Sequence, residues 1–223
     1  LLGAGVSLAP SLLASQNEAI QKVGMIGLDT SHAPAFTRII NAIDEDGNST
    51  GFKITHAYPH GSRDIESSVS RIPKYTKEME ELGVNIVSSI ADLLKEVDFV
   101  LLETNDGRLH LEQAKQVIDA GKPLFIDKPM AASLKDVIRI FEMAKLKQVP
   151  LFSCSSLRFS PSMTAIKNGQ IGKVLGADTF SPAKLEKTHP DLFWYGVHGV
   201  ESLFTLLGTG CKTVQRSFTN DTD

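Results

Sequence analysis

Short apolar runs alternate with amphipathic stretches along most of the chain. Runs that are hydrophobic at nearly every position, such as residues 99–102, predict strands that are buried on both faces of a sheet. Stretches with apolar residues three and four positions apart predict helices. The strands are expected at 23–27, 52–58, 99–102, 123–126 and 150–153, and the helices at 35–43, 89–95, 109–120 and 133–147. This alternation predicts an α/β domain over residues 22–153, built on a doubly wound parallel sheet.

The alternation stops after about residue 155. Beyond it the sequence has scattered glycines and prolines, two strand-like runs at 173–180 and 212–218, and one helical pattern at 197–207. We therefore expect a second, α+β domain with antiparallel strands over residues 154–223. Two strands and one helix bury too little surface for a core of their own, so we expect only the beginning of this domain here.

The first 21 residues form an apolar stretch that ends in small residues. This stretch is too short to span a bilayer as a helix, and its pattern is typical of the end of a secretory signal. It predicts export, with the periplasm as the compartment. The alternative is a core helix of a cytoplasmic protein, and neither interpretation includes a stable membrane span.

Composition and charge narrow the class of protein. The chain has 223 residues, of which 42% are hydrophobic and 22% charged, as is usual for a globular protein. Its formal net charge is -3 and it has no basic stripe, which argues against a nucleic-acid partner. Cys154 and Cys211 lie far apart and lack the short spacing of a thiolate metal site or a redox pair.

Four pieces of sequence carry candidate chemistry, and their order and spacing are informative. They are Val-Gly-Met-Ile-Gly-Leu-Asp-Thr-Ser-His at 23–32, Thr-Asn-Asp-Gly-Arg-Leu-His at 104–110, Gly-Lys-Pro-Leu-Phe-Ile-Asp-Lys-Pro at 121–129, and Gly-Val-His-Gly-Val-Glu at 196–201. Together they resemble the Gfo/Idh/MocA family, named for glucose-fructose oxidoreductase, inositol dehydrogenase and a rhizopine-catabolism protein. The third piece is the most specific.

The resemblance implies a two-domain oxidoreductase. A Rossmann-type domain at 22–153 would bind NAD or NADP, and a C-terminal domain with an open β-sheet would bind the substrate. It further implies a small-molecule substrate, a sugar or polyol, and a homo-oligomer formed through the C-terminal sheet.

The turn after the first strand departs from the usual dinucleotide motif. Gly27 is the first of its three glycines, whereas Asp29 and His32 stand in the places of the second and third. The expected cofactor contacts in this turn are Gly27, Leu28, Asp29, Thr30 and Ser31. A carboxylate at the closest approach would repel a diphosphate, and the alternative is that Asp29 and Thr30 cap the following helix.

Two other loops are expected at the same edge of the sheet. The second strand is not followed directly by the acid that often holds the ribose of NAD. Ser62 and Arg63 there could instead meet the 2′-phosphate of NADP, or Arg63 is simply solvated. After the strand at 99–102, Thr104 and Asn105 are expected on the nicotinamide side. His110 contacts substrate in one interpretation and forms hydrogen bonds at a helix start in the other.

Lys128 is the strongest functional signal. It follows the strand at 123–126 and precedes Pro129, and we expect it to lie beside the nicotinamide and to bond the substrate hydroxyl. Asp127 stands where the family has Glu, and we expect it to share the catalytic and cofactor-binding role. The alternative is a surface salt bridge.

His198 is the second catalytic candidate, as proton acceptor. The family's active dehydrogenases have an Asp four positions earlier, where this chain has Trp194, although Glu201 shares the helical face of His198. His198 could equally be a core residue. His198 and Glu201 with His189 or Asp191 lack a third ligand at reliable spacing, so no metal site is predicted.

Two functions therefore remain open from sequence. One is an NAD(P)-dependent oxidoreductase that transfers hydride to or from a sugar or polyol. The other is a family member without redox activity that serves as a carbohydrate-binding or structural protein, which would account for the departures at Asp29, His32 and Trp194.

Overall fold

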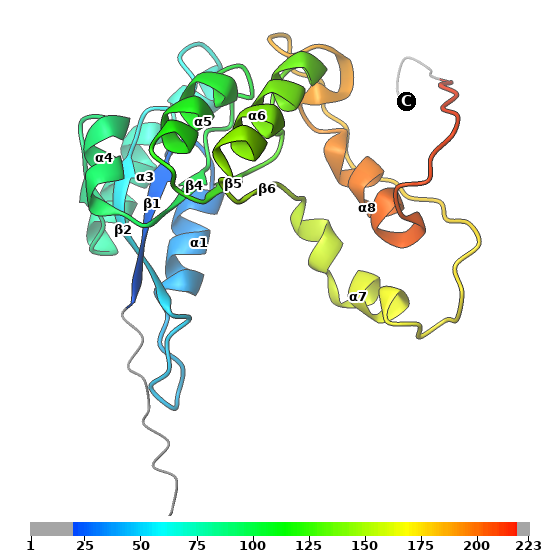
Figure 1. The fold of residues 1–223 in the computed structure, drawn as a ribbon, viewed down its shortest axis with the longest axis horizontal. Helices are drawn as coiled ribbons and strands as arrows, with labels where there is room; N and C mark the ends of the chain where they lie inside the picture. The colour runs from blue at the N-terminus through cyan, green and yellow to red at the C-terminus, as the bar shows by residue number, and fades with distance from the viewer. Residues whose placement is uncertain (1–19, 218–223) are drawn as a thin grey trace, which may run out of the picture.

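The structure is a computed structural model that describes residues 20–217 (Figure 1). Residues 1–19 and 218–223 lie outside the described part. The signal-like segment predicted over 1–21 therefore falls almost entirely outside it, and so does the last residue of the run at 212–218.

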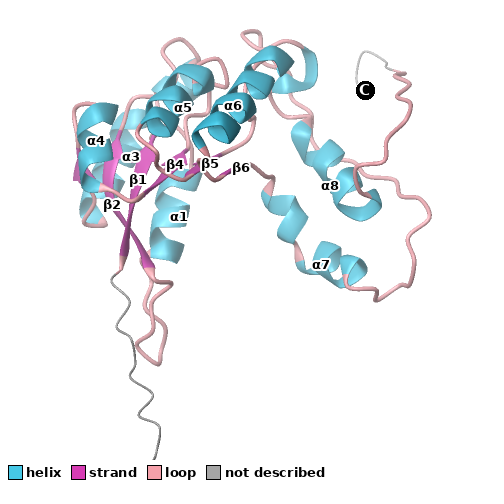
Figure 2. Cartoon of the chain, in the orientation of Figure 1, coloured by secondary structure: helices cyan, strands magenta, loops and turns pink. Residues whose placement is uncertain are grey.

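A six-stranded parallel sheet forms the centre of the first half of the chain, in the order β3-β2-β1-β4-β5-β6 (Figure 2). Every neighbouring pair is parallel. The strands are β1 (Gln21–Ile26), β2 (Phe52–Tyr58), β3 (Asn85–Ile86), β4 (Phe99–Leu102), β5 (Leu124–Ile126) and β6 (Leu151–Phe152). The doubly wound parallel sheet predicted from sequence is confirmed.

Helices cover both faces of this sheet. Neighbouring side chains of β1 point to opposite faces: Ile26 packs in a cluster with Leu93 and Ile140, whereas Met25 packs with Ala33 and Met79. The helices are α1 (His32–Ile40), α2 (Glu66–Val69), α3 (Ile72–Glu81), α4 (Ile90–Glu96), α5 (His110–Asp119), α6 (Leu134–Lys147), α7 (Pro161–Lys167) and α8 (Val197–Leu207). Short 3-10 helices lie at Ser156–Phe159 and Asp191–Phe193.

The sequence explains where several helices begin and end. Ser89 and Ser133 cap α4 and α6 by accepting hydrogen bonds from the N–H groups of Asp92 and Asp136. Gly121, at φ +69°, takes the left-handed conformation just beyond α5. α1 begins and ends three residues earlier than predicted, because Pro34 is tolerated in a first turn and Asn41 leaves the helix to exchange two hydrogen bonds with Ile54 of β2.

The antiparallel strands predicted for the second domain are not found. Among the described residues, 173–180 and 212–217 have no regular secondary structure, and the one antiparallel pairing is a single bridge between Ile43 and Ser49. A strand is stable only when it is paired, and here Leu175 and Phe180 are 85% and 98% exposed. The helix predicted at 197–207 is confirmed as α8.

The length and hydrophobicity of the described helices show whether any of them could cross a membrane. None of those between residues 20 and 217 combines the length and the apolar character that crossing a bilayer requires.

Candidate active site

The loops that follow β1, β2, β4 and β5 gather at the carboxyl edge of the sheet, because all strands run in one direction. Gly27 lies at the centre of this edge, where its N–H donates to the carbonyl of Tyr58 at 2.8 Å. Its φ is +89°, and a Cβ there would lie 2.5 Å from the backbone N of Thr104. Only glycine fits this close approach, so the first glycine of the motif is structurally required.

Asp29 ties two neighbouring loops together. Its side chain is fully buried, and its two carboxylate oxygens accept hydrogen bonds from the N–H groups of Ser62 and Asn105, each at 2.9 Å. Burial raises the pKa of Asp29, although these two hydrogen bonds act in the opposite direction. The carboxylate also fills the space over Gly61, where a Cβ would lie 2.2 Å from its Oδ2.

The proposed helix cap is only partly present. Ser31 occupies the N-cap position of α1 and makes no side-chain capping bond. Thr30 does bond near the start of the helix, where its Oγ1 accepts from the N–H of His32 at 3.3 Å. Asp29 does not cap α1, because its oxygens are turned toward Ser62 and Asn105. Leu28 has its side chain in the core and its N–H bonded to the carbonyl of Pro59, so it offers no free donor.

The end of β2 borders a cavity of about 230 Å³. Arg63 is exposed and lines this cavity together with His60 and residues of the loops before α4 and α5. Ser62 is buried instead, and its Oγ donates to Asp106 Oδ2 at 3.2 Å. Arg63 is therefore placed to meet a ligand in the cavity, whereas the hydroxyl of Ser62 is already engaged.

Thr104, Asn105 and His110 organise the loop after β4. Thr104 is fully buried, and its Oγ1 has no hydrogen-bond partner among residues 20–217. The ring of His110, also fully buried, bridges the carbonyls of Thr104 (Nε2, 2.6 Å) and Met130 (Nδ1, 3.1 Å). His110 thus joins this loop to the segment that carries Lys128, which matches its interpretation as a hydrogen bonder at a helix start.

Lys128 and Asp127 follow β5 at the same edge. Lys128 is only 7% exposed, so the surface salt bridge considered from sequence is excluded. Its Nζ lies 3.9 Å from Asp127 Oδ2 and 5.5 Å from the ring centre of Tyr195. Asp127 is also buried, and its Oδ2 lies 2.7 Å from Nδ1 of His32. The bond between Lys128 and Pro129 is cis.

His198 approaches the site from α8. Its Nδ1 lies 2.7 Å from the hydroxyl of Ser155, and its ring packs on Tyr195 with ring centres 4.8 Å apart. Partial burial lowers the pKa of His198, and the positive charge of Lys128 lowers it further. Tyr195 contacts both Lys128 and His198, so the structure brings the two catalytic candidates together.

The neighbours of His198 on α8 hold the helix in place. Glu201 accepts hydrogen bonds from the N–H of Ser155 at 2.6 Å and from Arg158 Nε at 2.7 Å. Trp194 is buried against the ring of His189. Among the described residues, these side chains do not converge with Asp191 on a common position for an ion.

Sequence reasoning missed Glu103 and Tyr195. Glu103 follows β4, is fully buried, and has no hydrogen-bond partner for either carboxylate oxygen among the described residues. A charged residue directly after a fully apolar strand is a signal that could have been used. Tyr195 carries no such signal, because its role depends on how α8 packs.

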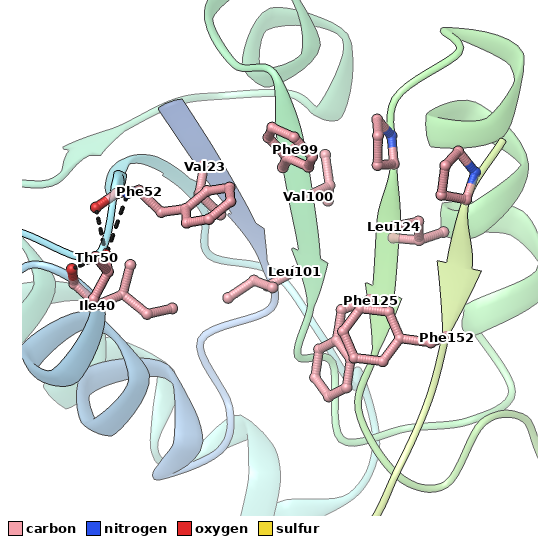
Figure 3. Close-up of a pocket in the computed structure, with 12 residues that line it drawn as sticks. Val23, Ile40, Thr50, Phe52, Phe99, Val100, Leu101, Leu124, Phe125 and Phe152 are labelled. Carbon is pink, nitrogen blue, oxygen red and sulfur yellow. Dashed lines mark hydrogen bonds between the residues drawn. The ribbon is translucent and has the colours of Figure 1, made fainter. Parts of the chain in front are cut away.

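An apolar pocket elsewhere on the sheet is not part of this site. It measures about 360 Å³ and lies on one face of the sheet, where Val23, Leu101, Phe125 and Phe152 line it (Figure 3). None of its lining residues carries a titratable side chain. The polar groups at the carboxyl edge therefore remain the candidate site.

Comparison with known proteins gives a family and several relatives. The family model for GFO_IDH_MocA, an oxidoreductase family with an NAD-binding Rossmann fold, matches residues 21–154, more than half of the chain. The uncharacterized oxidoreductase YhhX of Escherichia coli is 24% identical over 140 residues, which are 56% of this chain and 40% of YhhX. The putative oxidoreductase YceM of Salmonella typhimurium is 24% identical over 146 residues, 66% of this chain and 42% of YceM. The matches thus span less than half the length of these relatives.

Solved structures share the fold. GenD2 from gentamicin A biosynthesis, in complex with NAD, aligns with a TM-score of 0.64 at 16% identity, covering 93% of this chain and 57% of GenD2. An oxidoreductase from Agrobacterium radiobacter, in complex with NAD+, L-tartaric acid and magnesium, aligns with a TM-score of 0.60 at 16% identity, covering 85% of this chain and 55% of the other.

Proposed function

This chain belongs to the oxidoreductase family with an NAD-binding Rossmann fold, and we propose that it carries the nucleotide-binding half of an NAD(P)-dependent oxidoreductase that acts on a sugar or polyol. The observation that carries the proposal is the buried ammonium of Lys128 at the carboxyl end of β5, within reach of the same Tyr195 ring as His198. A buried cation at this edge of a doubly wound sheet lies where such folds bind their ligands.

The residues present fit the two ends of a dinucleotide. At the end of β2, Arg63 and His60 border a polar cavity for the adenosine end. At the end of β5, Lys128 and the unpartnered Thr104 hydroxyl offer polar groups to the nicotinamide end. Asp29 bonds to the loop after β2 and to the loop after β4, and its carboxylate is the group at this edge that opposes a diphosphate.

The bound nicotinamide would supply hydride acceptance and donation. Lys128 would donate a hydrogen bond to the substrate hydroxyl and orient it, since its ammonium is buried and has no acceptor closer than Asp127 at 3.9 Å among residues 20–217. We assign His198 the tautomer in which Nδ1 donates to Ser155 Oγ, which leaves Nε2 to take the hydroxyl proton. The lowered pKa of His198 keeps it neutral near pH 7, as a base must be.

The test of this proposal is binding followed by turnover. Calorimetric titration with NAD+ and NADP+ should give one site per chain, and a panel of sugars and polyols should include at least one substrate that reduces the bound nucleotide. Arg63→Ala should weaken NADP+ more than NAD+ if Arg63 meets the 2′-phosphate. Absence of nucleotide binding by the full-length protein would refute the proposal.

One observation favours the second function, a carbohydrate-binding protein without redox activity. The N–H groups of Ser62 and Asn105, in the loops after β2 and β4, are both already occupied by the Asp29 carboxylate. If the protein is a carbohydrate-binding protein of this kind, sugars should bind with or without nucleotide, and no sugar or polyol of the panel should reduce the nucleotide.

Two further parts of the proposal rest on the sequence. We infer export to the periplasm from the signal-like residues 1–21, and a homo-oligomer through a C-terminal sheet from the family resemblance. Cell fractionation and light scattering of the full-length protein test them.

A further inference from the structure

Glu103 is the least satisfied group in the described part of the chain. Its side chain has no exposed surface, and neither carboxylate oxygen has a hydrogen-bond partner among residues 20–217. Burial, and then the nearby carboxylate of Asp127, raise the pKa of Glu103 well above its usual value. A buried carboxylate without partners is costly, and either a proton or a cation relieves that cost.

His32 and Asp127 converge on Glu103 from two other elements. His32 opens α1, Glu103 follows β4, and Asp127 follows β5. One ligand atom from each of the three residues lies within 4.8 Å of the other two. Ligands about 2.0–2.2 Å from a common ion lie at most about 4.4 Å apart, so small side-chain movements suffice to bring all three into contact with one ion.

We propose that His32, Glu103 and Asp127 form a binding site for one divalent transition-metal ion. Two carboxylates balance the charge of the ion and suit Mn²⁺, and the imidazole favours Zn²⁺ over Mg²⁺ or Ca²⁺. His32 has a side chain that is 30% exposed, which gives the ion a path into the otherwise buried site. The site also gives a role to His32, which stands in place of a motif glycine and which nucleotide binding does not require.

The charges around the site act on a bound cation in opposite directions. Lys128 Nζ lies 3.9 Å from Asp127 Oδ2 and opposes a second cation nearby. The Asp29 carboxylate adds a negative charge that acts on Glu103 and favours a cation there. The metal site goes beyond the proposed hydride chemistry, because neither Lys128 nor His198 needs an ion for its assigned role.

The test measures metal binding alone, without nucleotide or substrate. The full-length protein is stripped with a chelator and titrated with Mn²⁺, and free Mn²⁺ is followed by electron paramagnetic resonance. We expect one Mn²⁺ per chain. Glu103→Gln, which keeps the size of the side chain, and His32→Asn, at a partly exposed position, should each weaken binding at least about tenfold. Glu112→Gln, an exposed acid on α5, is the matched control and should bind as the wild type does.

Two results would overturn the metal site. One is no bound Mn²⁺ at millimolar concentrations, and the other is binding by Glu103→Gln and His32→Asn that equals binding by the wild type. Either result would mean that a proton, and not a metal ion, neutralises the buried carboxylate of Glu103. Circular dichroism in chelator confirms that each variant is folded before titration. Because nucleotide is absent throughout, the outcome is independent of whether the protein is an oxidoreductase.

Discussion

Replacing Asp29 by glycine should destabilise the protein and tighten nucleotide binding at the same time. The buried carboxylate accepts two backbone hydrogen bonds at 2.9 Å, from Ser62 and Asn105. A hydrogen bond to a charged group contributes about 1.5–3 kcal/mol net, so the loss of two would cost about 3–6 kcal/mol. Relief of the buried charge offsets part of this cost, since burial raises the pKa of Asp29. We expect a net loss of about 3 kcal/mol in the free energy of unfolding.

Nucleotide affinity should change in the opposite direction. Glycine restores the second motif glycine, removes a charge from the crevice and frees both N–H groups for a diphosphate. We expect a gain of about 1 kcal/mol, which is roughly a fivefold tighter Kd.

Urea unfolding followed by circular dichroism measures the stability, and calorimetry with NAD+ measures the affinity. Asp29→Asn is the matched control, because it removes the charge but keeps one acceptor and should lose less stability. Weaker nucleotide binding by Asp29→Gly than by the wild type would refute the reasoning, since Asp29 would then be a direct ligand.

Three other predictions follow from single contacts. The pKa of His198 is lowered below its ordinary value of 6.5, so His198 should remain neutral at pH 6.5 and kcat/KM should fall only at lower pH. His198→Gln should reduce kcat about a hundredfold. A pH profile of kcat/KM with no fall on the acid side contradicts the role of His198 as a base. The folded-state pKa of Glu103 is raised above its ordinary value of 4.5, so the folded chain holds a proton that the unfolded chain has lost, and in chelator its stability should decrease as pH rises from about 4.5 toward the raised pKa. Urea unfolding of Glu103→Gln should depend less steeply on pH, and a slope equal to that of the wild type refutes this assignment. Gly24→Ala would place a Cβ 2.7 Å from Leu93 Cδ2 and should cost about 1–3 kcal/mol by urea unfolding, whereas no loss would show that α4 shifts freely.

The sheet could be predicted from sequence because its strands carry strong local signals. β2 and β4 match their predicted bounds, and Ser89 and Ser133 mark the starts of α4 and α6. The pattern gave no such signal for β3, which pairs over only two residues, or for α7. The runs at 173–180 and 212–217 have strand-like composition, but composition cannot supply a partner strand.

The site was predictable in outline and not in its contacts. The common edge of Gly27, Thr104 and Lys128 follows from strand direction alone. The partners of Asp29 are backbone groups 33 and 76 positions away, so no local pattern reveals that it joins two loops. The convergence of His32 with Glu103 and Asp127 likewise depends on three elements meeting in the fold.

Whether Lys128 takes part in hydride transfer is tested by Lys128→Met, with Lys135→Met at an exposed position on α6 as its control. In the full-length protein, with a substrate found in the panel, reduction of bound nucleotide is followed by absorbance and nucleotide affinity by calorimetry. We expect Lys128→Met to lower turnover about a hundredfold or more, with a nucleotide Kd within about twofold of the wild type, while Lys135→Met changes neither. Turnover equal to the wild type in Lys128→Met would contradict the account.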